Sequence, residues 1–96
     1  MKIQFTDIGK EVMTKTLQGR GMEKGPIRIF IQGFGWGGPV VGIALGEQNK
    51  DDILAESEEF EVYVEESIED MASMLEVDYS DKWYKKGFYI SNLKGC

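Results

Sequence analysis

Residues 27–45 read IRIFIQGFGWGGPVVGIAL, in which two apolar runs flank a segment rich in glycine. In the first run, Ile27, Ile29 and Ile31 occupy every second position, which is the period of a strand with one buried face. The second run, residues 40–45, is rich in β-branched and aliphatic residues and predicts another strand. The stretch therefore predicts two strands joined by a glycine-rich connection.

The connection, residues 33–38, matches the GxGxxG pattern of phosphate-binding loops. A dinucleotide-binding loop needs a helix directly after it, because the helix N-terminus supplies free N–H groups to the pyrophosphate. Here Pro39 and Val40 follow, and a β-branched residue after proline favours an extended chain. The glycine-rich loop of protein kinases does join two strands, but a kinase also needs a catalytic loop with histidine, and this chain has none. We therefore favour a hairpin turn.

Two aromatic residues inside this turn support two interpretations. In the first, Phe34 and Trp36 fold back onto the protein and anchor a small core. In the second, the glycines bring the backbone close to a ligand or partner, and an exposed Trp36 takes part in the contact, since tryptophan is enriched at binding hot spots. A simple turn needs only two residues, so the first interpretation explains the density of glycine poorly. The candidate site consists of Phe34, Gly35, Trp36, Gly37 and Gly38.

The rest of the chain predicts two helices and several more strands. A helix with an apolar stripe is predicted over residues 8–17, with Thr6 or Asp7 as its N-cap. A second amphipathic helix is predicted over residues 67–75, and residues 67–70 resemble a capping box at its start. The order of elements predicts an α+β fold with mostly antiparallel β-sheets and two helices. Further strands are predicted at residues 3–5, 53–54, 60–64, 77–79 and 88–90.

The composition, with 42% hydrophobic and 29% charged residues, is that of a soluble protein. The length predicts a single domain over residues 1–96. We expect no membrane partner, because no apolar run is long enough to span a bilayer and the N-terminus lacks the apolar segment of a signal peptide. The net charge of −6 argues against nucleic acid, whose phosphates need a basic surface. Cys96 is the only cysteine, so an internal disulfide is excluded and we expect a cytoplasmic protein.

The absence of histidine bears on catalysis. It removes the commonest general base and the imidazole metal ligand. No nucleophile with a neighbouring base is visible in the sequence, so we expect that the protein is not an enzyme.

Three other features have both a structural and a functional interpretation. The acidic stretch over residues 56–70 could bind Ca²⁺ or iron through oxygens, although a run of charges is usually a solvated face. Trp83 and Tyr84, together with Tyr79, predict aromatic packing near the last hairpin. The lysines within residues 82–86 form a small basic patch.

The order of a strand, a helix and the 27–45 stretch resembles the HesB-like, or A-type, iron–sulfur cluster biogenesis proteins. In that family a strand of the type "lRl.v...GCsGm.Y.l.." contains a cysteine within a glycine-rich turn. Aligned without gaps, Arg28 falls on the family's arginine. Gly35 and Gly38 fall on the glycines before and after the cysteine, and Trp36 falls on the cysteine itself.

Other segments extend the resemblance over nearly the whole chain. Asp51-Asp52-Ile53 is similar to the family's acidic pair before isoleucine. Residues 60–64 and 67–75 resemble the strand and the short helix that follow it. Residues 87–92, GFYISN, are similar to the family's "GF.f.NPN" strand. The resemblance therefore implies the α+β fold of a HesB-like domain.

The family's metal ligands are largely missing from this chain. The family binds iron or a cluster through three cysteines, one in the glycine turn and two in a C-terminal Cys-x-Cys. Trp36 has no metal-ligating atom, so Cys96 is the only plausible soft ligand. A [2Fe–2S] cluster normally needs four protein ligands. A homodimer would therefore offer too few cysteines without carboxylates or an outside thiol.

Two functions are consistent with this resemblance. The first is a non-catalytic accessory, scaffold or carrier protein of iron–sulfur cluster biogenesis with a degenerate metal-ligand set. It implies iron or an iron–sulfur cluster as the cofactor, or none, with iron–sulfur assembly proteins or apo-acceptors as partners and a homodimer as one oligomeric state. The alternative is a binding module on the same fold that has lost metal binding and uses the glycine-rich loop around Trp36 for interaction.

Overall fold

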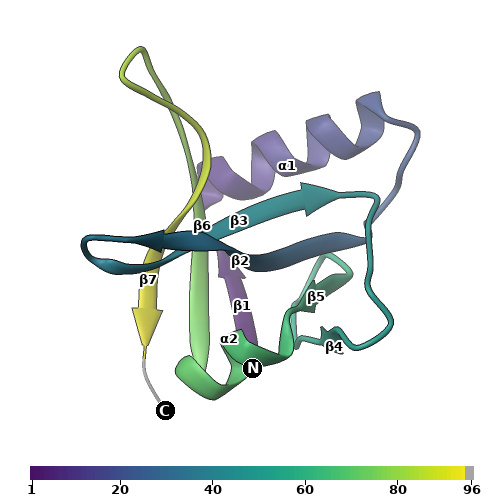
Figure 1. Ribbon diagram of the computed structural model, residues 1–96. Helices are drawn as coiled ribbons and strands as arrows, with labels where there is room; N and C mark the ends of the chain where they lie inside the picture. The colour runs from purple at the N-terminus through teal and green to yellow at the C-terminus, as the bar shows by residue number, and fades with distance from the viewer. Residues whose placement is uncertain (95–96) are drawn as a thin grey trace.

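Two sheets and two helices make up the computed structural model, which describes residues 1–94 (Figure 1). One sheet has the strand order β1-β6-β7, and the other has the order β3-β2-β5-β4. Helix α1 connects the two sheets, because it follows β1 and precedes β2. The strands are β1 (Lys2–Phe5), β2 (Ile27–Gly35), β3 (Gly38–Leu45), β4 (Ile53–Leu54), β5 (Val62–Val64), β6 (Met74–Lys82) and β7 (Lys85–Lys94), and the helices are α1 (Asp7–Gly19) and α2 (Glu66–Met71).

Antiparallel pairing dominates both sheets. β2 pairs with β3, β4 with β5 and β6 with β7 in the antiparallel sense. β1 with β6 and β2 with β5 are parallel pairs, and each of these is joined through a long connection, as parallel neighbours require. The predicted α+β fold with two helices and mostly antiparallel sheets is confirmed.

Helix α1 begins after Thr6, one of the two predicted caps. The Thr6 hydroxyl oxygen accepts a hydrogen bond from the backbone N–H of Gly9 at 3.0 Å. The same hydroxyl donates to Asp78 Oδ1 at 2.7 Å, so the start of the helix is tied to β6. Met13 and Leu17 on the inner face of α1 are fully buried. Within residues 1–94, no helix is long and apolar enough to cross a membrane.

The prediction of a second helix over residues 67–75 is wrong at its C-terminal end. Ala72 is already extended, with φ −145° and ψ 147°. Leu75 has the spacing of the predicted helix but lies fully buried in β6. The local pattern fits both a helical and a strand period, and here strand pairing and core packing decide between them. The predicted capping box is also wrong, because Glu65 occupies the N-cap position and no side chain caps the helix.

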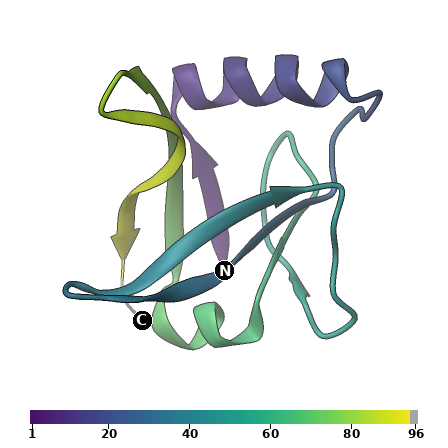
Figure 2. The same ribbon diagram turned by 45° about the horizontal axis from the view of Figure 1, so that its top comes forward.

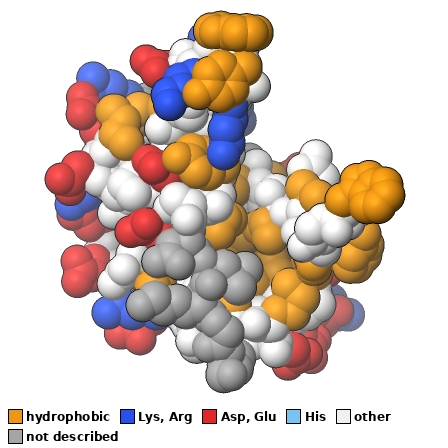
Figure 3. Space-filling model, turned by 90° about the vertical axis from the view of Figure 1, so that its left-hand side faces the viewer, with side chains coloured by type: hydrophobic (Ala, Val, Ile, Leu, Met, Phe, Trp, Pro, Cys, Tyr) orange, Lys and Arg blue, Asp and Glu red, His pale blue; other side chains and the backbone are white. Residues whose placement is uncertain are grey.

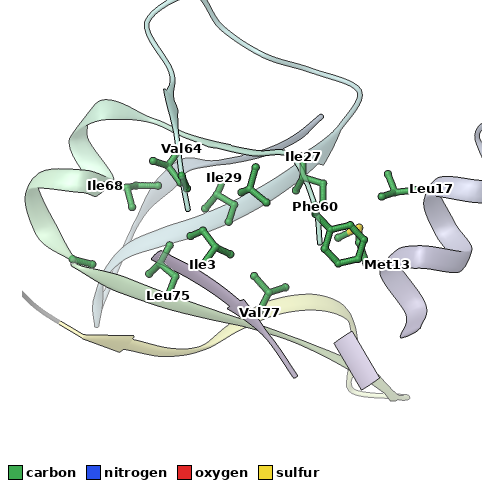
Figure 4. Packing of buried hydrophobic residues seen from close by; sticks show 13 residues of the cluster. Ile3, Met13, Leu17, Ile27, Ile29, Phe60, Val64, Ile68, Leu75 and Val77 are labelled. Atoms are coloured by element: carbon green, nitrogen blue, oxygen red, sulfur yellow. The ribbon is translucent and has the colours of Figure 1, made fainter. Parts of the chain in front are cut away.

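The core lies between the two sheets, with α1 covering one end of it (Figure 4). Every residue of this core cluster is apolar. Burying one aliphatic side chain contributes about 1.5–3 kcal/mol, so this cluster fixes the strands that reach into it. The largest fully buried side chains are Met13, Leu17, Ile27, Ile29, Val62, Val64, Ile68, Leu75 and Val77.

Candidate functional site

The glycine-rich segment forms the tip of the β2–β3 hairpin, as predicted. The two strands pair up to Gly35 opposite Gly38, so Trp36 and Gly37 alone make the turn. Gly38 has a φ of +109°, which residues with a side chain rarely adopt, so this position requires glycine. No helix follows the glycines, and the hairpin therefore lacks the helix N-terminus of a dinucleotide site. Figure 2 shows the hairpin extending beyond the neighbouring strands.

An irregularity separates the buried half of β2 from its tip. The register shifts between Ile31 and Gly33, which makes Gln32 the extra residue of a β-bulge. On the opposite strand, Gly42 pairs with Phe30. A Cβ atom at position 42 would lie 2.9 Å from Cζ of the Phe30 ring, so glycine lets this ring lie across β3. The bulge bends β2 at the point where its burial ends.

Both aromatic side chains of the tip point into solvent. Phe34 is 79% exposed and Trp36 is fully exposed at 109% of its reference area. The interpretation in which these residues fold back as core anchors is therefore wrong. The cause lies in the two-residue turn, which places Trp36 beyond the last strand pair, where no neighbouring element can cover it. The other interpretation, in which Trp36 contacts a partner, requires an exposed side chain, and Trp36 is exposed.

An ion pair anchors the base of this hairpin. Arg28 on β2 donates from Nε to Asp52 Oδ2 at 2.7 Å and from Nη2 to Asp52 Oδ1 at 3.3 Å. The two side chains are only 12% and 3% exposed. The guanidinium carbon also lies 5.0 Å from the centre of the Phe30 ring, within the range of a cation–π contact. The pair joins β2, an inner strand, to the residue directly before β4, which is an edge strand of the same sheet.

The electrostatics of this pair favour its charged form. Burial alone would raise the pKa of Asp52, but hydrogen bonds from Arg28 and from the backbone N–H of Asn49 outweigh burial and lower it. The hydrogen bond to Asp52 raises the pKa of Arg28 in turn. Arg28 and Asp52 belong to two separate motifs of the resemblance, and the sequence pattern did not predict that they meet. An arginine within an isoleucine run was the only signal that β2 needs a buried acidic partner.

A second carboxylate holds β2 beside the bulge. Glu65 Oε2 accepts a hydrogen bond from the backbone N–H of Ile31 at 3.0 Å, and Glu65 Oε1 accepts one from the Ser67 hydroxyl at 3.0 Å. The backbone N–H of Glu65 donates to the carbonyl of Ile29 at 2.9 Å. Glu65 therefore departs from the expectation that the acidic stretch is only a solvated face. Its contacts tie the base of the hairpin to the segment that precedes α2, whereas the aromatic side chains of the tip are exposed.

The structure offers no oxygen site for a metal in the acidic stretch. Among residues 1–94, no group of three or more histidine, cysteine, aspartate or glutamate side chains could hold a metal ion. Cys96, the predicted soft ligand, lies outside the described residues. Its role as a ligand therefore stays a prediction.

The prediction of aromatic packing near the last hairpin is correct for Tyr79 and wrong for the two residues at the tip. Tyr79 packs edge-on against Phe88 with ring centres 5.0 Å apart. Trp83 and Tyr84 form the turn between β6 and β7 and are 93% and 63% exposed. They contact one another, with ring centres 5.5 Å apart. β6 and β7 are longer than predicted, and their pairing carries this turn away from the core.

The arrangement of strands and helices matches solved structures. One is the crystal structure of IscA with the [2Fe–2S] cluster, with a TM-score of 0.69 and 22% identity over 94% of this chain and 84% of that one. The chain has the IscA-like fold. Another is Escherichia coli SufA, involved in biosynthesis of iron–sulfur clusters, with a TM-score of 0.67 and 18% identity over 95% of this chain and 80% of that one. No protein-family model matches the sequence, and no curated protein matches it significantly.

The IscA-like fold confirms the resemblance that the 27–45 stretch indicated. At 18–22% identity the likeness concerns the fold and not the ligands. In this IscA-like chain the residue aligned with the family cysteine, Trp36, lies at the solvent-exposed tip of the β2–β3 hairpin.

Proposed function

We propose that the protein acts in iron–sulfur cluster biogenesis as a non-catalytic accessory, scaffold or carrier protein of the cytoplasm. The observation that supports this role is the match of nearly the whole chain to the folds of IscA and SufA. The IscA structure holds a [2Fe–2S] cluster, and SufA is involved in biosynthesis of iron–sulfur clusters. Iron–sulfur assembly proteins and apo-acceptors are the partners that this role requires.

The metal-ligand set that goes with this role is degenerate. Trp36 replaces the family cysteine with a side chain that has no donor atom, and the residues within 1–94 form no alternative group of ligands. The described residues therefore do not fit a resident cluster. Cys96 is the one thiol of the chain, so a metal bound through it needs further ligands from a second copy, a partner or an outside thiol.

Anaerobic reconstitution with iron, sulfide and a thiol reductant tests this role. We expect visible absorption from thiolate-to-iron charge transfer in the wild type and its loss in Cys96→Ala. Metal analysis of both proteins gives the iron content per chain. A wild-type protein that stays colourless and free of iron would exclude a metal-binding role.

A second candidate function is favoured by the exposure of the hairpin tip. Under this hypothesis the protein is an interaction module that binds no metal, and Phe34 with Trp36 contacts the partner. Exposed tryptophan is rare and is enriched at binding hot spots. Here it lies on a hairpin whose base is fixed by the Arg28–Asp52 and Glu65 contacts.

The second function has a matched pair of variants. Trp36→Ala removes an exposed aromatic residue at the tip, whereas Leu54→Ala removes an exposed apolar residue from β4, where Leu54 is 62% exposed. Binding to an apo-ferredoxin as the trial acceptor should weaken in the first variant only, with iron content unchanged. Equal binding by both variants would count against the hairpin as a contact site.

A further inference from the structure

Both tryptophans of the chain lie in two-residue hairpin turns. Trp36 belongs to the turn between β2 and β3, and Trp83 to the turn between β6 and β7. They are 109% and 93% exposed, respectively. A single exposed apolar residue needs no explanation, but the fold gains no packing from placing both of its largest side chains at turns.

The two tips project from the same side of the molecule (Figure 3). β3 and β7 lie close together between them. Val41 and Ile43 on β3 and Phe88 and Ile90 on β7 are half-buried against the core. Figure 3 shows hydrophobic side chains in the recess between the tips, with other side chains and backbone among them.

The charge of the two tips differs from that of the whole protein. No charged residue occurs between positions 29 and 46, which include the β2–β3 hairpin tip. The other tip holds three exposed lysines, and none of them forms an ion pair within the described part of the chain. Lys82 Nζ lies 5.7 Å from the Tyr84 ring and Lys85 Nζ lies 3.8 Å from the Tyr89 ring. The two tips together thus carry three lysines and one acidic residue, Asp81, in a chain with a net charge of −6.

We propose that the two tips form one docking surface for an acidic segment of another protein. The two-tip surface consists of Phe34, Trp36, Trp83 and Tyr84, flanked by Lys82, Lys85 and Lys86. Apolar side chains of the segment occupy the recess between the tips. The aromatic residues of the two tips contact the segment at its two ends, and the carboxylates of the segment face the lysines. This inference rests on the second candidate function and extends it by naming the second tip and the chemistry of the partner.

Charge and shape favour an acidic protein segment over two other occupants. A symmetric contact with a second copy would bring the lysines of both copies into one interface without an excess of acids to pair with them, because a two-fold interface repeats the same patch on both sides. A flat bilayer would meet the projecting tips but would leave the recess between them empty. A flexible chain segment can fill the recess and pair with the lysines, as complementary charge at an interface requires.

Intrinsic fluorescence tests the proposal directly, because the chain has no tryptophan outside the two-tip surface. The probe is a short fluorescein-labelled peptide that alternates glutamate with leucine, titrated at physiological salt and followed by anisotropy. An unlabelled copy of the peptide should shift the tryptophan emission to shorter wavelength as the tips lose water. A peptide that alternates lysine with leucine, and one that alternates glutamate with serine, should bind at least tenfold more weakly.

Matched variants separate local charge from net charge. The triple variant K82E/K85E/K86E should weaken binding about tenfold, since each exposed ion pair contributes a modest share of affinity. The triple variant K15E/K24E/K50E changes the net charge equally at exposed positions away from the tips and should bind as the wild type does. Trp36→Ala and Trp83→Ala should each weaken binding about tenfold or more.

Several outcomes would overturn the proposal. Equal loss in both lysine variants would mean that only net charge matters, and loss in Trp36→Ala alone would mean that the second tip takes no part. Binding to vesicles of anionic phospholipid but not to the acidic peptide would make the surface a membrane contact. Concentration-dependent growth in size that Trp83→Ala abolishes would make it a self-contact. Iron binding that depends on Cys96 is measured separately, so failure of the docking surface leaves the first proposed function standing.

Discussion

Replacing Asp52 by asparagine should lower the free energy of unfolding by about 2–4 kcal/mol. Removing one partner of a buried ion pair costs about 3–5 kcal/mol, whereas an exposed pair contributes about 0.2–1 kcal/mol. Arg28 and Asp52 are 12% and 3% exposed, so the pair lies near the buried limit. The cost falls below that limit because Arg28 keeps its contact with the Phe30 ring and the attraction of Glu65.

The assay is urea denaturation at neutral pH, followed by far-ultraviolet circular dichroism because the exposed tryptophans report poorly on the core. Arg28→Met combined with Asp52→Leu should recover most of the loss, since well-packed apolar residues often replace a buried pair at little cost. Glu11→Gln is the control, because it breaks an exposed pair with Lys15 and should cost no more than about 0.5 kcal/mol. An Asp52→Asn cost as small as that of Glu11→Gln would refute the reasoning.

The same pair predicts a pH dependence with a definite sign. The pKa of Asp52 is lower in the folded protein than its ordinary value of about 3.9. Its contribution to stability is therefore complete well above the ordinary pKa and is lost as the pH falls through the lowered folded pKa. On acidification the wild type should lose more stability than the Arg28→Met, Asp52→Leu variant. The pKa of Asp78 is also lowered, but this group is present in both proteins and its effect cancels.

Three further predictions concern the hairpin and the first helix. Trp36→Cys should raise the iron content per chain after anaerobic reconstitution, since a dimer would then offer four cysteines; equal iron content in Trp36→Cys and Trp36→Ser would contradict this. Gly42→Ala should lower stability by about 1–3 kcal/mol because the new methyl group would overlap the Phe30 ring. An unchanged melting temperature would show that the ring moves aside freely. Thr6→Ala should cost about 1–2 kcal/mol through loss of the helix cap, measured by urea denaturation, with Thr16→Ala as the mid-helix comparison.

Local sequence patterns correctly predicted those elements whose apolar residues fit the period of a strand or of a helix, but not both. The alternation of isoleucine in residues 27–31 specified β2, and the apolar stripe of residues 8–17 specified α1, because each pattern agreed with its tertiary surroundings. Leu75 was assigned wrongly because its spacing fits a helix, while its burial between β1 and β7 depends on strands far away in the sequence.

Contacts between distant segments were beyond the reach of sequence patterns. The hydrogen bonds of Arg28 with Asp52 and of Ile31 with Glu65 join residues 24 and 34 positions apart. Neither acid differs in type from its exposed acidic neighbours, so no local signal distinguishes them. The exposure of Trp83 was missed for a similar reason, since composition predicts burial of an aromatic residue and only the hairpin register places it in a turn.

The geometry of the β2–β3 hairpin favours recognition by a preformed surface. Two buried isoleucines, the Arg28–Asp52 pair and the Glu65 contact all fix the base of β2, whereas the residues beyond the bulge contact solvent. A tip on a rigid base loses little conformational freedom on binding, so its aromatic side chains retain more of their contact energy as affinity. Softening the base should therefore weaken docking even where no contacting residue changes. Asp52→Asn is expected to raise the dissociation constant for the acidic peptide several-fold, and an unchanged constant would show that the tip orders itself independently of its base.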